Sequence, residues 1–136
     1  MSRPSLSPRL RTALVTGAGG GLGRAFAEML RAEGVEVWGT SRRPESLAAA
    51  ARFHPLGFDL AGGDAAAEAL VARVERESGG LDLLVHNAGF GVFGGLLDQP
   101  LAVWRAQLDG MLGVSFALDR AALAAMTPRR RGTIVN

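Results

Sequence analysis

The chain has 136 residues, of which 48% are hydrophobic, which is enough apolar material for one buried core. It has no cysteine and only two histidines, His54 and His86, so we expect neither disulfides nor a metal site. All 15 basic residues are arginine and the formal net charge is only +2, so the isoelectric point near 10.9 mostly reflects the high pKa of arginine. Without a recognisable nucleic-acid-binding motif, we expect no nucleic-acid partner.

The first residues carry no targeting signal that we can identify. Residues 1–11 lack the apolar centre of a secretory signal, and no apolar run reaches the roughly 18 residues needed to cross a bilayer. Their Ser-, Arg- and Pro-rich composition is weakly similar to a transit peptide, but the segment is short and has no amphipathic period. The sequence thus predicts a cytoplasmic protein without a membrane partner, with residues 1–11 as a flexible tail and residues 12–136 as one domain.

Short apolar runs alternate with helical patterns along the chain. The sequence predicts strands within residues 11–17, 35–43, 55–60, 81–89 and 132–136. Helices are expected within residues 22–33, 44–53, 62–80 and about 100–126. This alternation is typical of an α/β fold, a doubly wound parallel sheet with helices on both faces.

Two of the expected helices carry more detailed expectations. In the first, one apolar face would consist of Leu22, Phe26, Met29 and Leu30. In the third, Asp64 is expected to be the N-cap.

The segment ALVTGAGGGLGRAF, residues 13–26, joins the first strand to the first helix through a glycine-rich turn. Such a turn directs the free N–H groups and the positive end of the helix dipole toward the space above it, which predicts an anion site. Gly17 would permit the turn, Gly21 the close approach of a phosphate, and Gly23 the packing of the helix on the strand. The alternative is a glycine-rich connection that binds nothing. A P-loop is excluded because it requires a lysine, which this chain lacks.

The spacing of the glycines is specific. The pattern G-x-G-x-x-G fails, because leucine or arginine stands where its last glycine belongs, and the chain instead has TGAGGGLG at residues 16–23. Together with HNAG at residues 86–89, this segment resembles the cofactor loop and the Asn-Ala-Gly signature of the short-chain dehydrogenase/reductase family. The similarity continues through SRRPESLAAA, FDL, NAGFGVFG and GTIVN in the family's order, and so covers nearly the whole chain.

The resemblance implies a Rossmann-like domain, here truncated after the start of the fifth strand, that binds NAD or NADP. It further implies an oxidoreductase that acts on an alcohol or carbonyl substrate. The residues that match the family's cofactor site are Gly17, Gly21, Leu22, Gly23, Ser41, Arg42, Asp59, Leu60, Asn87, Ala88 and Gly89.

Residues after the second strand favour NADP over NAD. An acidic side chain there would bind the ribose hydroxyls of NAD, but the chain has Ser41, Arg42 and Arg43 instead. An arginine facing a phosphate contributes about 1.5 to 3 kcal/mol per hydrogen bond, although both arginines could instead be solvent-facing turn residues. Asp59 matches the family residue that binds the adenine amino group, and the alternative is a carboxylate that caps the next turn.

The HNAG segment carries the remaining expectations for the cofactor site. The resemblance implies that Asn87 holds neighbouring strands together and that Gly89 leaves room for the ribose. His86 stands where the family often has another Asn, and we expect it to have a packing role without chemistry.

The family's catalytic residues are a Tyr and a Lys in a Tyr-x-x-x-Lys pair, a Ser and an Asn. The chain contains no tyrosine and no lysine and ends at Asn136, and Met111 or Gly110 stands where the Asn belongs. We therefore assign no catalytic residue and expect the chain alone to be inactive. Alternatives are a noncatalytic dinucleotide-binding module and an inert remnant. The open sheet edge and the apolar helix at residues 100–126 predict self-association.

Overall fold

The computed structural model describes residues 10–136, so most of the expected tail, residues 1–9, lies outside the described part. Leu10 packs against the core, and the Arg11 N–H donates to Asp82 Oδ2 at 2.9 Å. These last two residues of the expected tail are therefore attached to the domain.

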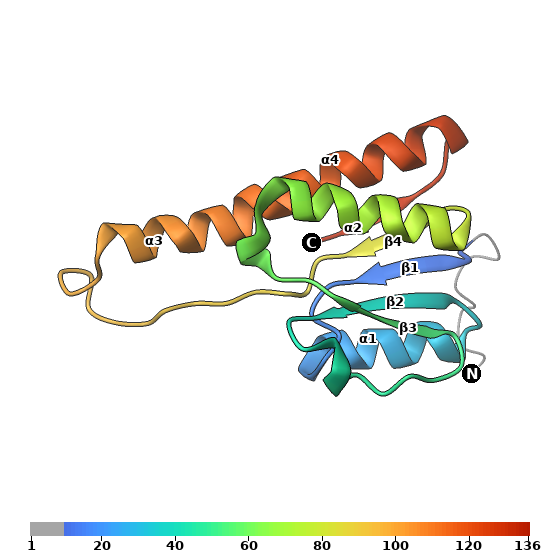
Figure 1. Cartoon of the computed structure of the whole chain (residues 1–136), viewed down its shortest axis with the longest axis horizontal. Helices are drawn as coiled ribbons and strands as arrows, with labels where there is room; N and C mark the ends of the chain where they lie inside the picture. Colours follow the sequence, from blue (N-terminus) through green and yellow to red (C-terminus); the bar gives the residue numbers. More distant parts are fainter. Residues whose placement is uncertain (1–9) are drawn as a thin grey trace, which may run out of the picture.

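Five parallel strands form one sheet in the order β3-β2-β1-β4-β5 (Figure 1). Their bounds are β1 Thr12–Val15, β2 Glu36–Ser41, β3 Phe53–Gly57, β4 Leu83–Val85 and β5 Thr133–Val135. Helix α1 covers one face, and α2 and α4 cover the other. The structure confirms the predicted doubly wound, Rossmann-like α/β fold.

The helices and turns follow the strands in alternation. The helices are α1 Gly21–Ala32, α2 Gly63–Ser78, α3 Leu101–Leu108 and α4 Val114–Met126, with a π-helical segment, η3, at Asp109–Gly113. Short 3₁₀ turns are η1 Pro44–Ser46, η2 Leu60–Gly62 and η4 Thr127–Arg129.

The core has one layer on each side of the sheet. Leu14 of β1 and Leu84 of β4 pack beneath α2 and α4, whereas Val15 and Val85 face α1. Strands β1 and β4 are buried on both faces. Their sequences therefore consist mostly of consecutive apolar residues and do not alternate between apolar and polar ones.

The face of helix α1 that packs against the sheet contains smaller residues than the sequence predicted. Gly23, Ala27 and Leu30 are buried, whereas Leu22 is 71% and Met29 is 46% exposed. The predicted apolar face was wrong at Leu22 and Met29. Close contact between the start of the helix and the end of β1 turns the helix so that its glycine, not its leucine, faces inward.

Residues 44–53 do not form the predicted helix. Only η1 is helical, the chain turns at Arg52 with a φ of +60°, and β3 starts at Phe53, two residues earlier than predicted. Leu47 and Phe53 are buried, but the four alanines between them, residues 48–51, are exposed. The middle of the segment therefore has no apolar face to pack, and helix propensity alone does not stabilise a helix there.

The start of α2 also differs from the prediction. Gly62 occupies the N-cap position, and Asp64 lies in the first turn without capping it. There its charge still complements the positive end of the helix dipole.

The predicted long helix is present as α3, η3 and α4 in succession. Helix α3 has no buried residue and projects beyond the sheet (Figure 1). Leu101 and Trp104 of this helix are exposed, and β5 is an edge strand of the sheet. These are the two features from which self-association was predicted, and self-association itself stays a prediction. Among residues 10–136, no helix is both long and apolar enough to span a membrane.

Candidate functional site

The glycine turn lies at the carboxyl end of β1, where the strand order changes direction. The chain proceeds from β1 to β2 on one side, whereas β4 pairs with β1 on the other. The crevice at such a switch point is where open α/β sheets bind ligands.

At two positions of the turn, neighbouring atoms lie so close to the backbone that only glycine fits. Gly17 has a φ of +67°, and a Cβ there would lie 2.9 Å from Ala88 Cα. A Cβ on Gly23 would overlap the carbonyl oxygen of Gly17 and the amide of Asn87. The predicted roles of Gly17 in the turn and of Gly23 in helix packing are confirmed. Gly21 also has a positive φ, +53°, and open space on its side-chain side, and its contact with a phosphate stays a prediction.

Asn87 and Thr16 tie the turn to the end of β4. Asn87 Nδ2 donates to the Thr16 carbonyl at 3.1 Å and to the Gly17 carbonyl at 3.0 Å, so Asn87 holds the two neighbouring strands together as expected. Thr16 Oγ1 accepts from the N–H groups of Asn87 and Ala88, both at 3.0 Å, and lies 3.3 Å from the Val85 carbonyl, to which it donates. The sequence analysis did not find this role of Thr16.

We expect Thr16→Val to lower the free energy of unfolding by about 2 kcal/mol, because two partly buried N–H groups lose their acceptor while the side-chain volume is kept. Urea denaturation followed by tryptophan fluorescence measures the change. Thr133→Val, at an exposed position of β5, is the matched control and should leave stability nearly unchanged. Equal stability of the Thr16 variant and the wild type would contradict this role.

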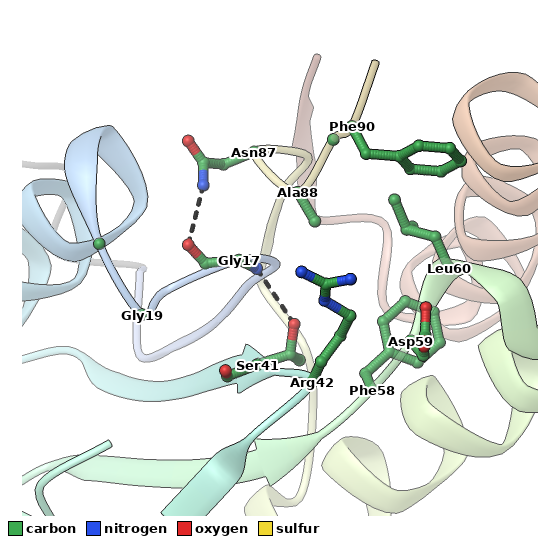
Figure 2. A pocket seen from close by; sticks show the side chains of 13 residues that line it. Gly17, Gly19, Ser41, Arg42, Phe58, Asp59, Leu60, Asn87, Ala88 and Phe90 are labelled. Atoms are coloured by element: carbon green, nitrogen blue, oxygen red, sulfur yellow. Dashed lines mark hydrogen bonds between the residues drawn. The ribbon is translucent and has the colours of Figure 1, made fainter. Parts of the chain in front are cut away.

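A cavity of about 310 Å³ opens above the turn (Figure 2). Its lining consists of Gly17, Gly19, Gly20, Thr40, Ser41, Arg42, Phe58, Asp59, Leu60, Asn87, Ala88, Gly89 and Phe90. The structure thus brings together eight of the eleven residues selected from the sequence. The other three, Gly21, Leu22 and Gly23, belong to the first turn of α1 and do not line it.

The lining also contains residues that the sequence analysis did not select: Gly19, Gly20, Thr40, Phe58 and Phe90. The run of glycines could have indicated the first two. Thr40 is recognised only through its contacts, because its hydroxyl accepts from the Gly17 N–H at 3.1 Å and its carbonyl from the Ala18 N–H at 2.8 Å.

Arg42 is the basic side chain of the cavity. It projects from the end of β2 between the glycine turn and the segment of Asp59 and Leu60 (Figure 2). Among residues 10–136 it forms no ion pair, so its charge is available to a ligand. The neighbouring Ser41 Oγ accepts from the Arg43 N–H at 3.1 Å, which fixes the turn after β2.

Asp59 caps the turn that follows β3. Its Oδ1 accepts from the Ala61 N–H at 3.0 Å, the capping geometry that the sequence left open as an alternative. The carboxylate also lines the cavity, and its contact with an adenine stays a prediction.

His86 lies beside the cavity and does not line it. Its Nε2 is 2.6 Å from Asp119 Oδ1 on α4, and its backbone N–H donates to the Val135 carbonyl at 2.8 Å. The side chain is mostly buried, in agreement with a packing role. Met111 is one of the two residues, with Gly110, that the sequence placed where the family has an asparagine, and its Sδ accepts from the Phe90 N–H at 3.3 Å.

The fold, with a cavity at the switch point of its sheet, is that of a Rossmann-like domain, and comparison with known proteins identifies its family. A family model described as short chain dehydrogenase matches residues 11–136, so the chain belongs to the short-chain dehydrogenase family, whose members bind NAD or NADP. Within residues 10–136 there is no group of three His, Cys, Asp or Glu side chains that could hold a metal ion.

Two relatives with oxidoreductase names illustrate the sequence similarity. The chain is 38% identical to an uncharacterised oxidoreductase of Myxococcus xanthus, over 92% of this chain and 52% of the relative. It is 33% identical to the 3-oxoacyl-acyl-carrier-protein reductase of Escherichia coli, over 92% of this chain and 53% of that enzyme. A short-chain dehydrogenase structure from Streptomyces avermitilis superposes with a TM-score of 0.87 at 32% identity, covering 96% of this chain and 50% of that one. The chain spans about half the length of these relatives.

Proposed function

We propose that this chain is the dinucleotide-binding part of an oxidoreductase that acts on an alcohol or carbonyl substrate, with NADP(H) as the preferred cofactor. The observation that carries the proposal is the position of Arg42, which lines a cavity beside the glycine turn and has no ion-pair partner among residues 10–136. In NAD-binding domains a carboxylate just after the second strand binds the ribose hydroxyls. Here no carboxylate follows β2 before Glu45, and serine and arginine occupy these positions instead.

The lining of the cavity fits a dinucleotide. Backbone without side chains at Gly19 and Gly20 gives a phosphate close access to the start of α1, whose free N–H groups and dipole favour an anion. Thr40 and Asn87 hold the turn that presents these groups. Gly89 and Ala88 leave space at the end of β4, which suits a ribose of the cofactor.

When bound, the cofactor supplies the hydride of the reaction. The residues of this chain bind and orient it, and none is proposed to move the accompanying proton. The 136-residue chain, which has neither tyrosine nor lysine, is proposed to bind cofactor without turnover by itself.

Calorimetric titration of the purified chain with NADPH and with NADH tests the proposal. We expect NADPH to bind about tenfold or more tightly than NADH, since one charge-assisted hydrogen bond to the 2′-phosphate contributes about 1.5 to 3 kcal/mol. Absence of binding to either cofactor by a chain shown by circular dichroism to be folded would reject the proposal. Tighter binding of NADH would reject the cofactor preference alone.

A further inference from the structure

Phe90 is an aromatic side chain of the cavity to which the sequence analysis gave no role. It follows the Asn-Ala-Gly segment, is 44% exposed and lines the cavity together with Phe58 and Leu60. Figure 2 shows its ring beside Leu60, on the side of the cavity that also holds Asp59 and away from the glycine turn. A half-exposed ring therefore lies on the side of the cavity opposite the glycine turn, where the phosphate is expected.

The ring is seated on a glycine of the π-helical segment. A Cβ on Gly110 would lie 2.7 Å from Phe90 Cε1 and 3.0 Å from Phe90 Cζ, so the ring would have to shift to make room for it. Gly110 is buried and has no positive φ, so the need for glycine here is one of space for the ring and not of backbone conformation.

The backbone of Phe90 is held by the next residue of the same segment. Its N–H donates to Met111 Sδ at 3.3 Å, and a Cβ on the preceding Gly89 would lie 3.0 Å from Met111 Cε. The π-helical segment thus fixes Phe90 twice, at its backbone through Met111 and at its ring through Gly110.

We propose that Phe90 is a stacking surface for the adenine base of the cofactor and that Gly110 sets the position of its ring. The inference rests on the proposed function and adds to it a base-binding residue and the helix segment that positions it. Aromatic rings stack on bases through their π-faces, and the apolar neighbours Phe58 and Leu60 add a surface from which a base excludes water. Gly110 acts only through Phe90 and is a positioning residue.

Replacement of the ring gives the first test. In calorimetric titration with NADPH, we expect Phe90→Ala to weaken binding about tenfold, the loss typical of one base–aromatic stack. Phe93→Ala is the control, because Phe93 is 95% exposed and does not line the cavity. Its NADPH affinity should equal that of the wild type.

Two glycines of the same segment provide a matched pair for the second test. Gly110→Ala and Gly113→Ala both raise helix propensity, but a Cβ on Gly113 meets no atom within 4 Å. We expect Gly110→Ala to weaken NADPH binding severalfold and Gly113→Ala to leave it unchanged. In a Phe90→Ala background, Gly110→Ala should have no further effect, because the ring that it displaces is gone.

The outcomes separate this inference from the proposed function. If the wild-type chain binds no NADPH, both fail. If the wild type binds NADPH and Phe90→Ala, folded by circular dichroism, binds it equally well, only the stacking role is wrong. NMR of the chain with ring-labelled phenylalanine gives a direct readout with 2′,5′-ADP, which carries adenine but no nicotinamide. The Phe90 ring signals should shift upfield on its addition, and unchanged signals at saturation would contradict stacking.

Discussion

Gly23→Ala is expected to destabilise the chain by about 3 kcal/mol, although alanine is the better helix former. In an exposed helix the substitution would stabilise by about 1 kcal/mol. Here the new Cβ overlaps the Gly17 carbonyl oxygen and the Asn87 amide, and lies 2.9 Å from the Gly17 carbonyl carbon. Two of these three atoms are backbone, which cannot move aside as the tip of a flexible side chain can, so the cost of overpacking exceeds the gain in propensity. Urea denaturation measures the change.

Gly20→Ala is the matched control for this prediction. It lies in the same turn with an extended φ of −175°, and a Cβ there meets no atom within 4 Å. We expect its free energy of unfolding to fall by less than about 1 kcal/mol, the loss from a weaker N-cap residue alone. A Gly23→Ala chain as stable as the wild type would show that the helix start can move away from β1, and the account of the turn would then be wrong.

Arg42→Ala is expected to weaken NADPH binding by about ten- to a hundredfold and to change NADH binding little, so that the chain no longer prefers NADPH. Arg42 is the basic side chain in the lining of the cavity, and within residues 10–136 it has no carboxylate partner that would compete with a phosphate. Loss of a guanidinium from a phosphate removes one or two charge-assisted hydrogen bonds, each contributing about 1.5 to 3 kcal/mol. Calorimetric titration with both cofactors measures the selectivity.

Arg43→Ala removes the same charge from the next residue and controls for the general electrostatic field. Arg43 is exposed and does not line the cavity, so its removal should weaken NADPH binding less than twofold. Equal losses for the two variants would show that overall charge, not a contact of Arg42, determines cofactor preference. An Arg42→Ala chain that keeps its NADPH preference would overturn the selectivity argument.

The sequence was sufficient for the fold wherever its patterns are set by burial. The apolar runs at residues 13–15 and 83–85 predicted strands of a parallel sheet, and all six residues are buried. It was insufficient at residues 44–53, where alanine content predicted a helix but the alanines at residues 48–51 are exposed and pack against nothing. Propensity is a weak guide there, because packing of an apolar face supplies most helical stability in proteins.

The sequence by itself determined the kind of site: a strand, a glycine turn and a helix start, with Arg42 and no acid after the next strand. These depend on local backbone geometry and on charge, which short segments encode directly. The tertiary structure decided which residues meet. Thr16 accepts from a residue that lies 71 positions away in the chain, and the ring of Phe90 packs against Gly110 of the π-helical segment. Leu22 turns outward for the same reason, since contact between elements distant in the chain, and not the local pattern, selects which face of α1 is buried.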